Sequence, residues 1–164
     1  MNLNLNTILD RPGAKLDFES SFDFSTLGLP QIARFLEDVF VSGTVQNIAG
    51  ALTLKGELSL SAEFICDRCT KEFPWAYTLP VVAHLAEHIT EEDNPDLFLL
   101  EGGAAPIEEI FITAFLLELD GKTVCQEECA GLCSTCGFDL NDGPCTCPRE
   151  VDSRLSALGQ LLEE

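Results

Sequence analysis

Basic residues are scarce in this chain of 164 residues. Nine Lys and Arg face 28 Asp and Glu, which gives a formal net charge of −19. A surface this acidic repels the phosphate backbone of nucleic acids unless its few cations are clustered. The charge favours a basic partner, although acidity also serves simply to keep a protein soluble.

Long apolar runs are missing as well. The sequence has no stretch of about 18 apolar residues, the length that spans a bilayer, and residues 1–6 lack the basic and apolar regions of a secretory signal. We therefore expect a cytoplasmic protein. Thiols stay reduced in the cytoplasm, so the eight cysteines indicate a metal site rather than disulfides.

Catalytic motifs are also absent. The sequence contains no Gly-rich phosphate loop, no Gly-x-Ser-x-Gly and no His-Glu-x-x-His. The two histidines, His84 and His88, fall in a stretch with strand periodicity, which gives little support for ligand pairing on a helix. A zinc ion closed by four thiolates leaves no position for a substrate. We therefore expect that the protein is not an enzyme.

The chain does contain a clear alternation of apolar and polar residues, which is typical of half-buried strands. Alternation runs over residues 52–64 and again over 73–85, with Cys66 and Cys69 in between, which predicts a long hairpin. Shorter runs predict strands over residues 15–24, 39–45 and 97–100, with a turn at 47–50.

Three segments have helical patterns. Pro106 and the acidic residues after it begin a helix whose apolar face packs on the sheet. A short helix is predicted over 29–40 and another over 152–162, where Asp152 caps a leucine stripe. An acidic loop covers 91–95.

These patterns predict an α+β fold in two parts. Residues 1–120 form an antiparallel, partly barrel-like sheet with its packing helix. Residues 121–164 form a C-terminal cysteine-rich zinc module and a terminal helix, because this segment has too few aliphatic residues for a core of its own.

Six cysteines fall within residues 125–147. Cys133-Ser-Thr-Cys136-Gly has the form of a zinc knuckle, in which two thiolates bind one ion from a tight turn. Structural zinc requires two further thiolates. The spacing does not determine which ones, and the order of preference is Cys129 and Cys147, then Cys145 and Cys125.

Other interpretations of the cysteines remain open. The spacing of Cys129, Cys133 and Cys136 also fits radical S-adenosylmethionine enzymes, although their barrel is larger than this chain, and four cysteines can also hold another iron–sulfur cluster. Cys66 and Cys69 form a second pair, with free thiols or a second or shared metal site as alternatives. The nearby cations Arg68 and Lys71 favour reactive thiols, so the pair also fits a thiol-based redox or metal-responsive regulator.

Direct RNA binding has little support from charge. The stretch from Cys125 to Cys147 contains no Lys or Arg. The one concentration of positive charge is Lys55, Arg68 and Lys71, around the predicted hairpin, and a solvated surface is its simpler interpretation.

The cysteine motifs resemble those of one known family. Cys66-Asp-Arg-Cys69 follows a long strand, and Cys129-Ala-Gly-Leu-Cys133-Ser-Thr-Cys136-Gly-Phe-Asp-Leu-Asn141, Cys145-Thr-Cys147 and Asp152-Ser-Arg154 come later in the chain. In order and spacing these segments resemble the YceD family, the large ribosomal RNA subunit accumulation proteins. The stretch from Gly131 to Asn141 is the specific part of this resemblance.

The resemblance implies a bacterial or plastid protein needed for accumulation of 23S ribosomal RNA. It carries over no catalytic residue. Taken with the charge, it implies a basic ribosomal protein or a large-subunit precursor as partner, held by an acidic surface until assembly. The expected function is therefore that of a non-enzymatic factor in large-subunit biogenesis with a structural zinc site.

Overall fold

The computed structural model describes residues 1–87, 97–119 and 121–147. Its main element is a six-stranded sheet in which neighbours follow the order β2-β4-β5-β6-β7, with β3 added beside β5. The strands are Lys15–Phe22 (β2), Ile32–Phe35 (β3), Val39–Ile48 (β4), Ala51–Ile65 (β5), Glu72–Ala86 (β6) and Leu97–Leu99 (β7). The pairs are antiparallel except β6 with β7, which is parallel.

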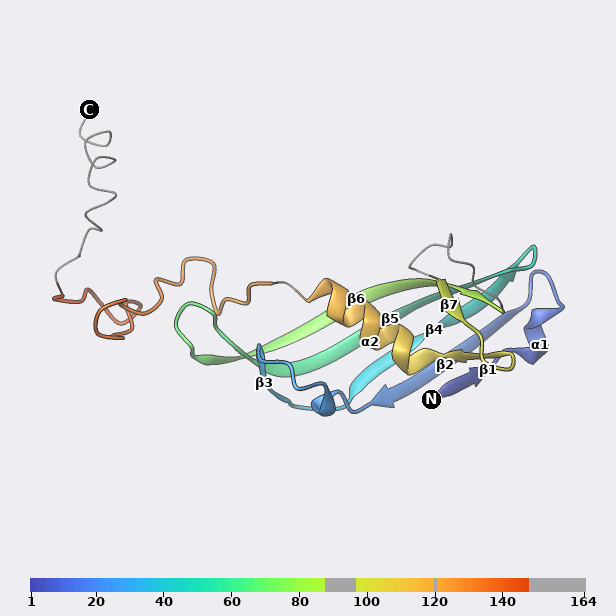
Figure 1. Ribbon diagram of the computed structural model, residues 1–164, viewed down its shortest axis with the longest axis horizontal. Coiled ribbons are helices and arrows are strands. Elements are labelled where there is room, and N and C mark those ends of the chain that lie inside the picture. The colour runs from blue at the N-terminus through green and yellow to red at the C-terminus, as the bar shows by residue number, and fades with distance from the viewer. Residues whose placement is uncertain (88–96, 120, 148–164) are drawn as a thin grey trace, which may run out of the picture.

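The remaining elements lie at the margins of this sheet or, in the case of the longer helix, over one of its faces (Figure 1). They are two short paired strands, Asn2–Asn4 (β1) and Ala104–Pro106 (β8), the short helices Asn6–Leu9 (α1) and Ser25–Leu27 (η1), and the longer helix Ile107–Glu118 (α2). The fold is therefore sheet-dominated, with one substantial helix, which agrees with the predicted α+β class. No described helix has the length and apolarity needed to cross a membrane.

The sheet is open, which corrects the expected partly barrel-like form. Strands β2 and β7 stand at the two ends of the strand order, and in the described ranges they do not pair with each other. A barrel needs that last pairing to remove its two edges. Here β7 is only three residues long, so it extends the sheet at one end of β6 without curling it closed.

The predicted hairpin is confirmed. Strands β5 and β6 pair continuously from Leu52 opposite Leu85 to Ile65 opposite Glu72, and the cysteine pair lies in the loop between them. Alternation places one face of each strand in the core. The buried residues of β5 on this face are Leu52, Leu54, Leu58, Leu60, Ala62 and Phe64, and those of β6 are Leu79, Val81, Ala83 and Leu85.

Helix α2 covers the middle of this face (Figure 1). Its buried residues are Ile107, Ile110, Phe111 and Phe115, a spacing that places them on one side of the helix. Phe111 fits because the sheet beneath it has glycine, not a side chain: Gly43 and Gly56 lie opposite each other on β4 and β5. A Cβ added to Gly56 would stand 2.9 Å from Cζ of Phe111 and 2.6 Å from the Ser42 carbonyl oxygen.

The predicted helix over 29–40 is wrong, because this segment contains β3 and the start of β4. Strand β4 pairs with β5 only as far as Ser59, which leaves the end of β5 without a neighbour on that side. Strand β3 fills the position, and Arg34 forms an ion pair with Glu63 at 2.8 Å. Tertiary pairing therefore overrides the local helical pattern. The predicted acidic loop, the terminal helix and His88 lie outside the described residues.

Replacing Gly56 tests the close approach of α2. We expect Gly56→Val to lower the free energy of unfolding by about 2 kcal/mol, because the new side chain must displace Phe111 or the β4 backbone. Gly121→Ala is the matched control, since a Cβ there meets nothing within 4 Å. Urea unfolding of the two variants measures the difference, and equal stability would contradict this packing.

Candidate metal centres

The eight cysteines, all free thiols, gather into two groups of four. In each group the four Sγ atoms lie within 4.8 Å of one another. We call Cys66, Cys69, Cys125 and Cys129 the buried tetrad. We call Cys133, Cys136, Cys145 and Cys147 the outer tetrad. Either group can hold a metal ion.

The buried tetrad has the spacing of a single tetrahedral site. The Sγ atoms of Cys66 and Cys129 are 3.8 Å apart, and those of Cys69 and Cys125 are 3.7 Å apart. A zinc–sulfur distance of about 2.3 Å places the sulfurs of a tetrahedron about 3.8 Å from one another. Cys66, Cys69 and Cys129 are almost fully buried, so an ion held here is shielded from water.

The loop between β5 and β6 contains Cys66 and Cys69, and it forms hydrogen bonds with the segment that contains Cys125 and Cys129. The Thr70 amide donates to the Cys66 carbonyl at 2.8 Å, which closes the loop around its two cysteines. Asp67 exchanges hydrogen bonds with the backbone of Thr123 through its amide and its carboxylate. The Arg68 guanidinium donates to the Cys129 carbonyl at 2.8 Å. These contacts hold segment 123–129 against the loop.

The outer tetrad is built locally and lies near the surface. Within the knuckle, the Gly137 amide donates to the Cys133 carbonyl at 2.9 Å, and Gly137 has a φ of 73°, which favours glycine. The Sγ atoms of Cys136 and Cys145 are 3.4 Å apart. The Cys147 amide donates to the Cys145 sulfur at 3.2 Å. Cys136 is exposed and its three partners are half-buried, so this group is the more accessible of the two.

Asn141 links the two tetrads. It lies in the outer loop between Cys136 and Cys145, yet its Nδ2 donates to the Cys129 sulfur at 3.4 Å and its Oδ1 accepts from the Ala130 amide at 2.8 Å. A hydrogen bond to sulfur stabilises a thiolate and orients it toward a metal. The outer loop therefore supplies part of the environment of the buried tetrad.

An ion pair strengthens the same link. The Lys71 ammonium, in the β5–β6 loop, lies 2.7 Å from Asp139 and 3.6 Å from Asp142 in the outer loop. The Lys71 cation lowers the pKa of Asp139, and hydrogen bonding to Asp139 raises that of Lys71. Because both charged forms are favoured together, this contact is retained over the ordinary pH range.

The electrostatics of both tetrads favour a cation. Burial acts to raise the pKa of Cys66, but backbone hydrogen bonds lower it overall, to about 6. Backbone hydrogen bonds likewise lower the pKa of Cys133 to about 6. Burial and neighbouring thiols raise the pKa of Cys125 to about 12, and neighbouring thiols raise that of Cys147 to about 12. One thiolate thus forms readily in each group, and a central cation would also favour the thiolate form of Cys125 and Cys147.

The structure groups the six predicted ligands differently from the order of preference that the sequence suggested. Cys133 and Cys136 lie together with Cys145 and Cys147, while Cys125 and Cys129 join Cys66 and Cys69. Cys129 is therefore not grouped with Cys133 and Cys136, the set that a radical S-adenosylmethionine cluster needs. The expected ligand set did not include Cys66 and Cys69, for which free thiols and a second or shared metal site had both been open. The number of cysteines could have indicated them, because eight cysteines are enough for two closed sites of four ligands each.

The two groups predict a metal stoichiometry. We expect the reduced protein to bind two thiophilic metal ions per chain, and Cys66→Ser and Cys133→Ser each to retain one. Elemental analysis with thiol counting measures both quantities. A single ion in the unaltered protein, or two in either variant, would contradict the assignment of four cysteines to each site.

The contact of Asn141 with Cys129 predicts an effect across the two sites. We expect Asn141→Ala to weaken metal binding at the buried tetrad by about tenfold, because outer hydrogen bonds to ligands typically contribute 10–100-fold. Competition with a chelator, carried out in the Cys133→Ser background so that one site remains, measures this affinity. Ser134→Ala is the control, since Ser134 is exposed in the same loop and makes no described hydrogen bond. Equal affinities of the two variants would contradict the link.

One family model matches the chain. Its description is large ribosomal RNA subunit accumulation protein YceD, and the match covers residues 54–162, from β5 through both tetrads. No curated protein and no solved structure gives a match.

Proposed function

This chain belongs to the YceD family, and we propose that it is a non-enzymatic factor in biogenesis of the large ribosomal subunit, supporting accumulation of 23S ribosomal RNA in the cytoplasm. The family match is the observation that carries this proposal, because it extends over most of β5, over β6 and α2, and over all eight cysteines. Each cysteine group would be a structural centre and not a reaction centre, since four thiolates would close the coordination of a bound ion.

We propose that both tetrads hold structural zinc. The sulfur spacing supports a single ion in each, because an iron–sulfur cluster divides its four cysteines among two or four irons and holds the sulfurs on different irons farther apart. Thiolate ligands in tetrahedral geometry are the preferred environment of zinc. In the buried tetrad the ion would be bound by the β5–β6 loop and by segment 125–129, which are remote in sequence, so binding stabilises the folded state.

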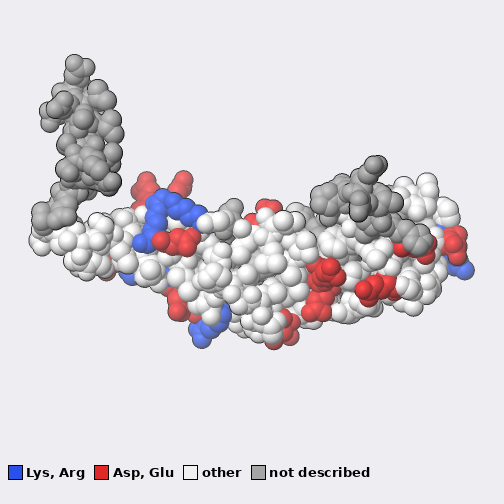
Figure 2. All heavy atoms as spheres, in the orientation of Figure 1, with Lys and Arg blue, Asp and Glu red and all other residues white. Residues whose placement is uncertain are grey.

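The partner that fits the charge is a basic protein. Acidic side chains are spread along the visible face and basic ones are few (Figure 2), in keeping with the net charge of −19. Such a surface attracts a basic ribosomal protein, or a precursor particle that contains one, and speeds the encounter.

The contacts of the hairpin loop do not favour direct RNA binding. Arg68 and Lys71 already have partners within the chain. Arg68 donates a hydrogen bond to the Cys129 carbonyl, and Lys71 forms an ion pair with Asp139. Lys55 lies near the start of β5, and the loop follows the other end of this strand. The three cations therefore do not form one patch that could follow a phosphate backbone.

A redox role for Cys66 and Cys69 is the alternative function. Their grouping with Cys125 and Cys129 supports metal binding instead, because a bound ion occupies the thiolates that would react. The alternative predicts rapid alkylation of both cysteines in the freshly purified protein, whereas slow alkylation that accelerates on adding a chelator supports the metal.

Depletion of the protein in its host tests the proposed function. We expect the ratio of 23S to 16S ribosomal RNA to fall and the free large subunits to decrease, and RNA quantification with a sucrose-gradient profile measures both. Re-expression of the unaltered protein is the control and should restore the ratio. An unchanged ratio and profile would remove the proposed role.

A further inference from the structure

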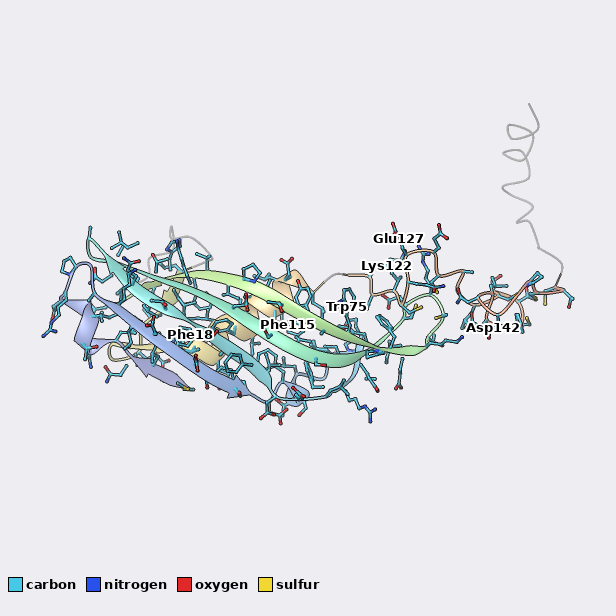
Figure 3. The ribbon with its side chains drawn as sticks, turned by 180° about the vertical axis from the view of Figure 1, so that it is seen from behind. Phe18, Trp75, Phe115, Lys122, Glu127 and Asp142 are labelled. Carbon is cyan, nitrogen blue, oxygen red and sulfur yellow. The ribbon has the colours of Figure 1, made fainter. Side chains whose placement is uncertain are left out.

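A hollow lined by aromatic side chains lies where α2 ends above the sheet. Its lining comes from β5, β6, the last turn of α2 and the segment that follows it, and it is a shallow depression open to solvent. We call it the aromatic hollow, and its residues are Phe64, Trp75, Tyr77, Phe115, Glu118, Leu119 and Thr123. Figure 3 shows Phe115 where the helix lies over the sheet and Trp75 beyond the end of the helix, on the side that leads to the cysteine-rich segment.

Trp75 is the unusual member of this set. It lies on the core-facing side of β6, with the same parity as the buried Leu79, yet 41% of it is exposed. The cause is the length of α2, which ends at Glu118 and leaves the sheet beyond it uncovered. The indole is nevertheless held in place, with ring centroids 5.6 Å from Phe64 and 6.4 Å from Tyr77. The result is a fixed aromatic platform that water can reach.

The end of α2 adds uncompensated negative charge to the platform. The last turn of the helix contains no basic residue, although helix C-termini, with their exposed carbonyl groups, favour cations. Glu118 lies in that turn and is exposed, and it makes no ion pair or hydrogen bond with the described residues. The nearest described cation in sequence, Lys122, lies toward Glu127 on the side of the cysteine-rich loops (Figure 3).

We propose that the aromatic hollow binds an arginine side chain from a basic polypeptide. A guanidinium is planar, stacks on Trp and Tyr faces, and pairs with a carboxylate through two hydrogen bonds, while its aliphatic stem packs on apolar groups. The hollow offers each of these surfaces: Trp75 for stacking, Glu118 for pairing and Leu119 for the stem. Lysine satisfies only some of them, because its ammonium is a compact, strongly hydrated charge.

This inference rests on the proposed function in one respect, the choice of a basic protein as partner. The net charge of −19 supports that choice independently of the family, because it draws basic chains to the surface before any specific contact forms. The aromatic hollow then supplies the specific contact, in which one arginine is anchored.

The fluorescence of Trp75 tests the inference directly, because it is the only tryptophan in the chain. The probe is the peptide acetyl-Gly-Leu-Arg-Leu-Gly-amide, titrated into the full-length protein. We expect a saturable change in Trp75 emission, with affinity about tenfold lower when norleucine replaces arginine and intermediate with lysine. Equal affinity for the norleucine peptide, or no change in emission, would overturn the proposal.

Two variants identify the groups involved. We expect Glu118→Gln to weaken binding of the arginine peptide several-fold, and Glu57→Gln, on the opposite face of β5, to leave it unchanged. Calorimetry with Trp75→Leu, whose fold is checked by circular dichroism, should show loss of binding. Binding that survives either Glu118→Gln or Trp75→Leu at full affinity would place the peptide elsewhere and overturn the proposal.

Two other occupants have their own signatures, and either would overturn the proposal. If the C-terminal leucines fill the hollow, Leu155→Gln with Leu158→Gln will shift Trp75 emission to longer wavelength without peptide. If a second copy fills it, the emission will change on dilution. The peptide titration requires no ribosomal component, so its failure leaves the depletion experiment intact, and the reverse also holds.

Discussion

The pairing of β5 with β6 is the interaction on which the rest of the structure depends. Its register is continuous from Leu52 opposite Leu85 to Ile65 opposite Glu72, so a single ribbon extends along most of the sheet (Figure 1). Helix α2 packs on the apolar face of this two-stranded hairpin. The far end of the hairpin provides the loop with Cys66 and Cys69, so the position of the buried tetrad follows directly from the register of the hairpin.

The second part of the chain is organised by sulfur and polar contacts more than by apolar packing. Segment 121–147 joins the hairpin loop through Asp67, Arg68 and the buried tetrad, and Asn141 and Lys71 extend the connection to the outer loop. Thr123 belongs both to this connection and to the lining of the aromatic hollow. The buried tetrad and the proposed arginine site are thus adjacent, and an ion bound by the tetrad would fix both the loop and one side of the aromatic hollow.

Much of the fold could be predicted because its signals are local. Period-two alternation identified β2, β4, β5 and β6, and Pro106 with the acids after it identified the start of α2. The errors arose where local pattern and tertiary pairing disagree. Residues 32–35 carry a weak pattern of their own and become a strand only because the end of β5 needs a neighbour. Closure into a barrel likewise depends on whether β2 and β7 meet, which no local pattern encodes.

The amino-acid sequence by itself determined the chemistry of the protein: eight cysteines in short-spaced pairs, a large excess of acidic residues, and strands with one apolar face. The tertiary structure decided which cysteines meet. Cys66 and Cys129 are 63 positions apart, so their approach depends on the hairpin loop and the chain after α2 reaching the same place. It also decided that Trp75, apolar and on the core face, remains exposed. The burial of Trp75 depends on where α2 ends relative to the sheet. That position is set by how the helix packs on the sheet, not by the local sequence around Trp75.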